Sequence, residues 1–94
     1  MKSKHELIAR RRRQLAVHSY IYYELNDNLV SDHTWQKWAN ELQDLQAYNP
    51  DYSDDYDQWF ENWNGTTGYH LCQILGLHTL ATRLLDYDQK LNRT

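Results

Sequence analysis

The sequence has little cysteine, proline or glycine, and each shortage excludes a class of structure. Its single cysteine, Cys72, excludes an intramolecular disulfide and a zinc site made of cysteines alone, and we expect a reducing, cytoplasmic environment. The one proline, Pro50, and the three glycines, which all follow residue 64, leave the first half almost free of helix breakers. No stretch approaches the roughly 18 apolar residues of a membrane span. We therefore expect neither a membrane protein nor a secreted one.

Aliphatic residues are modest in number, and aromatic residues supply much of the hydrophobic content. Hydrophobic residues make up 40% of the 94 residues and charged residues 24%, which is ordinary for a globular protein. The four Trp, eight Tyr and one Phe can each bury roughly 150–250 Å². The length predicts a single domain over residues 1–94, with a core in which aromatic side chains carry much of the packing.

Apolar residues recur at helical spacing along most of the chain. They predict a helix over residues 4–25, a turn at 26–28, and a second helix that begins after an N-cap at Ser31 and ends before Pro50. Aromatic residues over 51–63 predict a third helix, and apolar residues over 71–85 predict a last helix, or two short ones broken near Gly76. No alternating strand pattern is present. We therefore expect an all-α fold, a single small bundle of about four helices.

The net charge of −3 is unevenly distributed, with a basic N-terminal segment and seven acids but no base over residues 41–61. Four consecutive arginines at about 100° each encircle a helix, so their turn should protrude, where it could contact nucleic-acid phosphates or a protein. The acids over residues 51–61, here called the acidic segment, could imitate DNA phosphates and occupy a basic site on a host defence protein, or could form the solvated face of a helix and pair with the basic turn. The candidate interaction residues are Arg10, Arg11, Arg12, Arg13, Asp54, Asp55, Asp57 and Glu61.

A second group of reactive side chains lies near the C-terminal end. His70, Cys72 and His78 are close in sequence, but their spacing matches no standard zinc pattern and a fourth ligand is missing. We expect Cys72 and His78 to pack in the core instead, and we expect no metal site.

Residues 18–51 contain a pattern more specific than helical periodicity. It runs His-Ser-Tyr-Ile-Tyr-Tyr over 18–23, Asn-Asp-Asn over 26–28 and Val-Ser-Asp over 30–32, then Glu41-Leu42, Leu45 and Pro50-Asp51. This pattern resembles the small N-terminal helical subdomain of bacterial NAD-dependent DNA ligases, at the same spacing and without a gap. The resemblance assigns a ligase-like helix pair to residues 4–49 and leaves residues 51–94 as an additional acidic, aromatic helix and a C-terminal helix.

In those ligases the subdomain closes over the nicotinamide mononucleotide (NMN) half of NAD. Taken position by position, the resemblance implies that Tyr22 and Tyr23 match the aromatic pair that grips this nucleotide, and that Asp32 matches the acid of a Ser-Asp motif. Trp35 stands where the family has tyrosine, which keeps an aromatic face without the hydroxyl, and Gln36 stands where the family has aspartate. The resemblance thus implies an NMN or NAD site made of Tyr22, Tyr23, Asp32 and Trp35.

The catalytic parts of a ligase are missing from this sequence. It has no Lys-x-Asp-Gly adenylation motif, no zinc-finger cysteines and too few residues for a nucleotidyltransferase domain. Its segment 66–71, Thr-Thr-Gly-Tyr-His-Leu, is similar to one in small ligase-related proteins of phages and prophages of Gram-positive bacteria. This second resemblance implies a binding protein without catalysis, in the cytoplasm of a bacterial host cell, with a host or phage protein as its partner.

Two classes of function stay open for the aromatic and acidic residues. As a small-molecule site they would sandwich a flat cation, which predicts an open cleft near Tyr22 and Asp32. In the alternative, Tyr22 and Trp35 pack the first two helices together, Asp32 caps the second helix, and the protein acts as an interaction module. That module would use its charged faces and an aromatic surface that includes Trp59 and Trp63.

Overall fold

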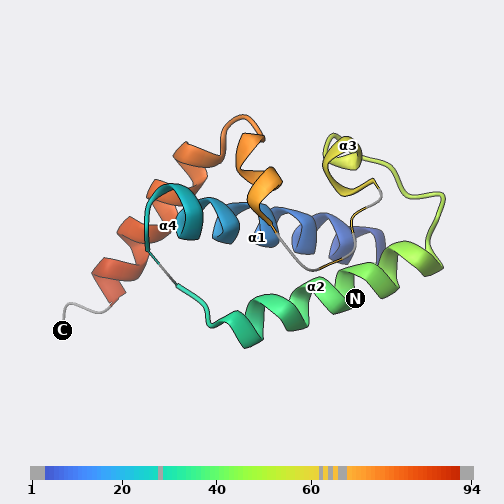
Figure 1. Cartoon of the computed structure of the whole chain (residues 1–94), viewed down its shortest axis with the longest axis horizontal. Coiled ribbons are helices and arrows are strands. Elements are labelled where there is room, and N and C mark those ends of the chain that lie inside the picture. The colour runs from blue at the N-terminus through green and yellow to red at the C-terminus, as the bar shows by residue number, and fades with distance from the viewer. Residues whose placement is uncertain (1–3, 28, 62, 64, 66–67, 92–94) are drawn as a thin grey trace.

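The fold is all-α, as the sequence predicts. The computed structural model describes residues 4–27, 29–61, 63, 65 and 68–91. Four α-helices span Lys4–Glu24 (α1), Asp32–Tyr48 (α2), Asp57–Phe60 (α3) and Leu77–Leu91 (α4), and a 3-10 helix, η1, spans Tyr69–Gln73 (Figure 1). No strand occurs within these described ranges. The expectation of a small all-α bundle of about four helices is confirmed.

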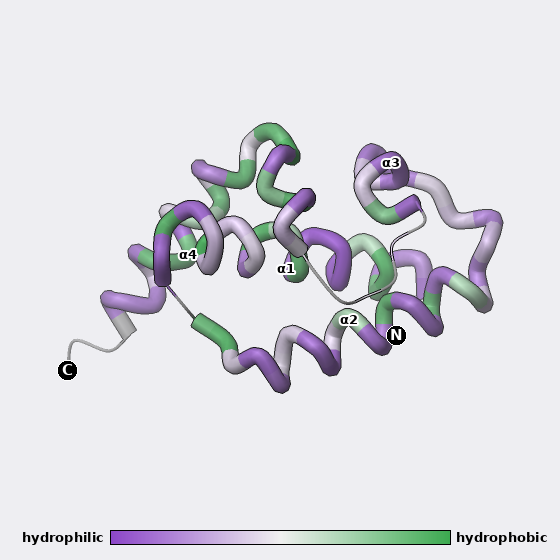
Figure 2. The backbone as a smooth tube through the Cα atoms, viewed as in Figure 1, coloured by the Kyte–Doolittle hydropathy of each residue, from purple (hydrophilic) through white to green (hydrophobic). Residues whose placement is uncertain are grey.

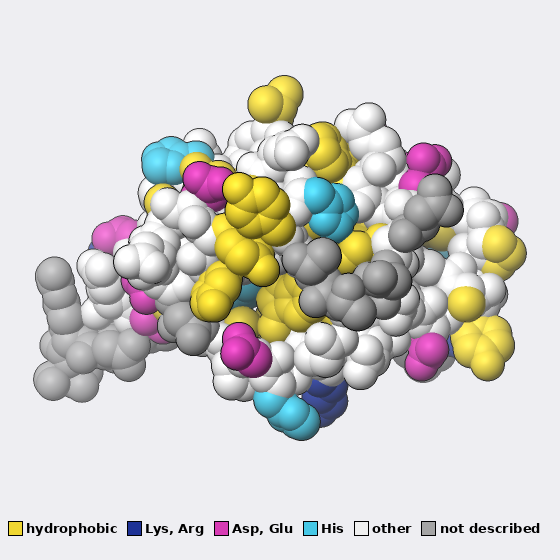
Figure 3. Space-filling view, viewed as in Figure 1, with side chains coloured by type: hydrophobic (Ala, Val, Ile, Leu, Met, Phe, Trp, Pro, Cys, Tyr) yellow, Lys and Arg dark blue, Asp and Glu magenta, His cyan; other side chains and the backbone are white. Residues whose placement is uncertain are grey.

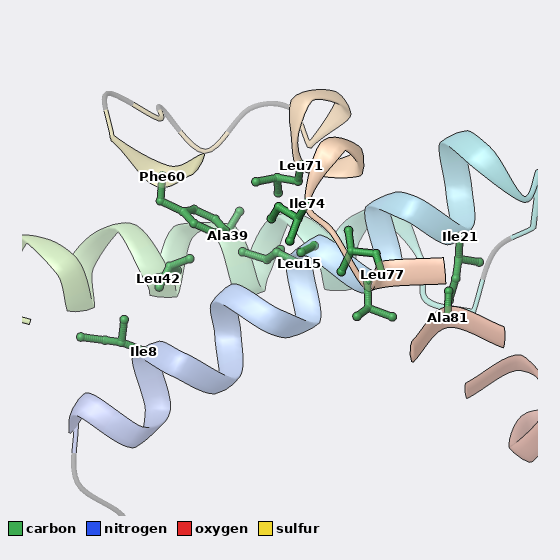
Figure 4. Close-up of a cluster of buried hydrophobic side chains, with 12 residues drawn as sticks. Ile8, Leu15, Ile21, Ala39, Leu42, Phe60, Leu71, Ile74, Leu77 and Ala81 are labelled. Carbon is green, nitrogen blue, oxygen red and sulfur yellow. The ribbon is translucent and has the colours of Figure 1, made fainter. Parts of the chain in front are cut away.

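α1 is the central element and packs against α2, η1 and α4. The residues Ile8, Arg12, Leu15 and Ser19 of α1 are all buried, and their spacing of four, three and four places them on one face of the helix. Ile8 and Ile21 lie toward opposite ends of the buried cluster, which runs along α1 (Figure 4). On α2, hydrophilic residues dominate the side turned away from α1 (Figure 2). The hydrophobic core therefore extends along the length of α1 instead of being concentrated at one point.

The local signals for helix starts and breaks are confirmed. Ser31 is the N-cap of α2, and its Oγ accepts a hydrogen bond from the Thr34 backbone N–H at 3.1 Å. Between η1 and α4 the chain turns at Gly76, whose φ of +87° lies in the left-handed region that glycine adopts readily. The C-terminal part thus consists of two helical segments broken near this glycine.

The prediction of a third helix over residues 51–63 is wrong for most of its length, because α3 covers only Asp57–Phe60. The Asp54 carboxylate accepts a hydrogen bond from the Tyr56 N–H at 2.8 Å, and the Asp57 carboxylate accepts one from the Asp54 N–H at 3.1 Å. Such local side-chain bonds compete with helical backbone bonds. The aromatic spacing therefore indicated a helix where carboxylates fold the chain into turns.

The same two carboxylates bind a buried arginine. Arg12 is 6% exposed, and its Nη1 donates to Asp54 at 2.6 Å and to Asp57 at 2.7 Å. Its Nε donates to the Gln46 side-chain oxygen of α2 at 2.8 Å. Charge-assisted hydrogen bonds of this kind are roughly twice as strong as neutral ones. Arg12 thereby joins α1 to α2 and to the acidic segment.

Aromatic rings complete the surroundings of this guanidinium. Its carbon lies 5.2 Å from the ring centre of Tyr52 and 5.4 Å from that of Phe60, within the range of cation–π attraction. The expectation that the four-arginine turn protrudes as a whole is therefore wrong at Arg12. A charge can be buried at this position because two carboxylates, 42 and 45 residues away in sequence, compensate it.

Replacing Arg12 should destabilise the protein much more than replacing its neighbour. Arg12→Ala leaves two carboxylates and a glutamine without their donor, and we expect a loss of roughly 2–4 kcal/mol, below the full buried-pair range because both carboxylates keep some contact with water. Urea unfolding measures the loss. The matched control is Arg13→Ala, an exposed position where the change should stay within about 0.5 kcal/mol. Equal losses in the two variants would contradict the assigned role of Arg12.

Acid should weaken the fold through Asp57. Hydrogen bonds from Ser53, Arg12 and the Asp54 backbone lower the pKa of Asp57 from 3.8 to about 2. A carboxyl whose pKa is lower in the folded state binds fewer protons there, so its contribution is present above pH 3.8 and is lost as the pH falls through about 2. We expect the free energy of unfolding to fall over this interval, and Asp57→Asn to flatten the fall. Asp55→Asn, at an exposed position, should leave the slope unchanged.

Candidate functional site

A cleft of about 280 Å³ lies where the C-terminal part of α1 meets the first turns of α2 and the residue before η1. The four residues that the ligase resemblance singles out, Tyr22, Tyr23, Asp32 and Trp35, all line it. They come from two helices and meet because α1 and α2 pack side by side. His18 and Gln36 also line the cleft, so polar side chains from both helices join the aromatic ones there.

Tyrosines form an exposed aromatic row beside the cleft. Tyr22 and Tyr23 are 52% and 42% exposed, with ring centres 4.9 Å apart and an interplanar angle of 88°. The Tyr23 ring also meets the edge of Tyr69 of η1, at 5.1 Å and 85°. Hydrophobic side chains gather at the centre of this face of the molecule (Figure 3). The alternative in which Tyr22 packs the first two helices together is therefore wrong, because half of this side chain faces solvent.

Trp35, in contrast, is held firmly against α1. Its indole N–H donates to the Ser19 hydroxyl at 3.1 Å, and its ring meets the edge of Trp63 at 6.4 Å. The backbone at Gly68 passes so close that a Cβ there would lie 2.1 Å from Ser19 Oγ and 2.9 Å from Trp35 Cζ2. Only glycine fits this approach, so α1 and the chain before η1 together fix the aromatic wall that Trp35 contributes.

One carboxylate, Asp32, and several neutral polar side chains line the cleft. Asp32 is exposed in the first turn of α2, and the cap of that helix is Ser31 rather than Asp32. The Gln36 amide donates to Asn40 at 3.1 Å and to the Gly65 carbonyl at 2.8 Å. Because both amide hydrogens are used in these bonds, Gln36 can offer the cleft its carbonyl oxygen, an acceptor.

His18 is a neutral member of the lining. Burial lowers the pKa of His18 below its usual 6.5, since a charged imidazole is poorly solvated there. Its ring lies 5.4 Å from that of Trp38, and its Nδ1 is a buried polar atom without a hydrogen-bond partner in the described part of the chain. Near pH 7 the ring thus adds polar atoms to the cleft but no positive charge.

The candidate interaction residues are divided between internal pairs and exposed positions. Arg11 forms an ion pair with Glu41 of α2 at 2.9 Å, and Arg12 is bound by Asp54 and Asp57 as described above. The remaining candidates are exposed on the surface: Arg10, Arg13, Asp55 and Glu61. The acidic segment therefore pairs with the basic turn at two of its carboxylates.

The side chains of His70, Cys72 and His78 have different surroundings in the C-terminal part. His70 Nε2 lies 2.7 Å from the Trp59 carbonyl oxygen, and burial, the largest influence, raises the pKa of the half-buried Cys72 thiol to about 11, so it is a poor nucleophile. The prediction that His78 packs in the core is wrong, because its side chain is exposed and its Nδ1 lies 3.1 Å from the Tyr20 hydroxyl. No three metal-ligating side chains converge anywhere in the described ranges.

Six further residues line the cleft: His18, Ser19, Leu29, Val30, Gln36 and Gly68. His18 and Ser19 belong to the motif that carries the ligase resemblance, so the signal for them was present. Gly68, and Tyr69 beside it, lie more than 30 residues beyond Asp32, in the segment that carries the second resemblance, and nothing in that segment indicated a contact with the cleft. Their approach to Ser19 and Tyr23 depends on the packing of η1 on α1.

A methyl group at Gly68 should displace the wall of the cleft. Gly68→Ala places a Cβ inside the contact distances to Ser19 and Trp35, and we expect a loss of about 1–3 kcal/mol, as for overpacking in a core. The Trp35 indole N–H resonance should shift as its bond to Ser19 is disturbed. Gly76→Ala is the control, since its strained φ costs about 1 kcal/mol without touching the cleft. An unmoved Trp35 resonance in Gly68→Ala would contradict this description.

Comparisons with protein-family models, with curated proteins and with solved structures give no match to this chain. None of the described helices combines the length and the apolarity needed to cross a lipid bilayer. The residues of the cleft and their surroundings are therefore the features that point to a function.

Proposed function

We propose that this protein binds the nicotinamide ring of a nicotinamide nucleotide, NMN or NAD, in the cleft between α1 and α2. The observation that supports the proposal is the convergence of Tyr22, Tyr23, Asp32 and Trp35 on one cleft. The resemblance to the ligase subdomain implies these residues as a ligand site, and a cleft lies beside Tyr22 and Asp32, where nucleotide binding requires one. A chain without adenylation chemistry would use such a cleft for binding alone.

The chemistry of the lining suits a flat cation. The faces of Tyr and Trp rings attract positive charge by roughly 0.5–2 kcal/mol, and the oxidised nicotinamide ring carries such a charge. The Asp32 carboxylate adds an opposite charge at the rim, and the Gln36 carbonyl oxygen can accept a hydrogen bond from a carboxamide or a ribose hydroxyl. A volume of about 280 Å³ is at the small end for ligand sites, so it suits the ring and its ribose, with the rest of NAD outside.

Titration of the isotope-labelled protein with NMN and NAD tests this proposal. We expect saturable shifts of the Tyr22, Asp32 and Trp35 backbone amides and of the Trp35 indole N–H. Asp32→Ala should weaken binding roughly fivefold or more, since it removes the opposite charge. Asp44→Ala is the matched control, because this exposed acid lies on the same helix about 18 Å farther along.

Shifts that do not saturate, or that appear away from the cleft, would contradict the proposal. The absence of shifts at millimolar ligand would reject nicotinamide binding altogether. Either result would favour the second candidate function below.

A protein-interaction module is the second candidate, and the exposed apolar side chains favour it. Tyr69, in η1, is 62% exposed, and Leu75, at the turn before α4, is 95% exposed, so both side chains are accessible to a partner. Imitation of DNA by the acidic segment has less support, because Asp54 and Asp57 bind Arg12 of the same chain. A partner would therefore meet tyrosine and leucine side chains rather than a row of free carboxylates.

A further inference from the structure

We propose that the cleft selects a flat organic cation that carries no phosphate, such as a pyridinium nucleoside, over the corresponding phosphorylated nucleotide. This inference rests on the proposed function, because it specifies which nicotinamide compound the same cleft holds best. It follows from the distribution of charge around the cleft. A site that binds phosphate normally supplies Arg or Lys side chains or free backbone N–H groups.

The described lining of the cleft contains one carboxylate, Asp32, and no Lys or Arg. His18 does not replace them, because burial lowers its pKa and keeps the imidazole neutral near pH 7. On the face that Figure 3 shows, Lys and Arg side chains appear only at the margins of the described surface, whereas Asp and Glu side chains lie beside the central hydrophobic group. A phosphate at the cleft would therefore meet negative charge without a compensating base.

The two bases nearest in sequence to the cleft residues of α1 and α2 are too far along the helix or lie on another of its faces. Between Arg13 and Lys37 the sequence contains no Lys or Arg. Arg13 lies nine residues before Tyr22 on α1, about 14 Å along the axis, and charges separated by more than about 10 Å are largely screened at 0.1 M salt. Lys37 is exposed on α2, but it lies about 140° around the helix from Asp32. Neither base can pair with a phosphate seated beside Asp32.

The N-terminus of α2 is the one feature that would favour an anion, since its first N–H groups carry partial positive charge. Two observations reduce this attraction. The Ser31 hydroxyl already accepts the hydrogen bond of the Thr34 N–H, and Asp32 places a full negative charge within the first turn. The carboxylate outweighs a helix end worth about half an elementary charge. The local field thus favours a cation.

The experiment compares four ligands by calorimetry or by titration followed by NMR: 1-methylnicotinamide, nicotinamide riboside, NMN and neutral nicotinamide. We expect the riboside to bind roughly three- to tenfold more tightly than NMN at 50 mM salt and pH 7.5, where the phosphate is largely doubly ionised. Screening should narrow this gap at 500 mM salt. 1-Methylnicotinamide should bind more tightly than neutral nicotinamide, because only the former carries the charge.

Variants separate the charge of Asp32 from other causes. Asp32→Asn should weaken the riboside more than it weakens NMN and so reduce the gap between them, whereas Asp44→Asn should preserve the gap. Equal binding of the riboside and NMN, or tighter binding of NMN, would overturn the inference while leaving nicotinamide binding intact. NMN binding that is lost in Lys37→Gln would also overturn it, by identifying a base for the phosphate. Failure of all four ligands to bind would reject the proposed function itself.

Discussion

The interaction of Arg12 with Asp54 and Asp57 is the constraint on which the rest of the structure depends. It draws the acidic segment onto α1, replaces a regular third helix by turns and a single short helix, and brings Phe60 into the core. Phe60 then meets the edge of Trp63 at 5.1 Å, and Trp63 meets the edge of Trp35 at 6.4 Å. Arg12, near the middle of α1, is thereby connected to Trp35 in the wall of the cleft. The connection runs through the rings of Phe60 and Trp63.

Aromatic residues that look equivalent in the sequence differ in burial and in contacts at the cleft. Trp35 is half-buried and bonded to Ser19, so it does help to join the first two helices, as the structural interpretation expected. Tyr22 and Tyr23 project from α1 into solvent at the rim, where the ligand interpretation expected aromatic faces. Each interpretation therefore describes some of these side chains. An anchored tryptophan opposite exposed tyrosines, with an acid at the rim, is an arrangement suited to holding a flat cation between rigid and accessible faces.

Charge patterns left open whether the basic turn and the acidic segment contact other molecules or pair with each other. The structure shows pairing within the chain, of Arg12 with Asp54 and Asp57 and of Arg11 with Glu41 of α2. An internal network of this kind leaves few charges to define a binding face. The described lining of the cleft contains one carboxylate and no Lys or Arg, which supports the proposed preference for a cation.

The sequence by itself determined the features that depend on neighbouring residues. The extents of α1 and α2, the cap at Ser31 and the break at Gly76 follow from spacing and from bonds across a few residues. Tertiary structure alone decided the partners of Arg12, the loss of the third helix and the approach of Gly68 to Ser19. The physical reason is sequence separation. Helical periodicity reports on residues three or four apart, whereas a guanidinium more than 40 residues away can stabilise turns that no local pattern predicts.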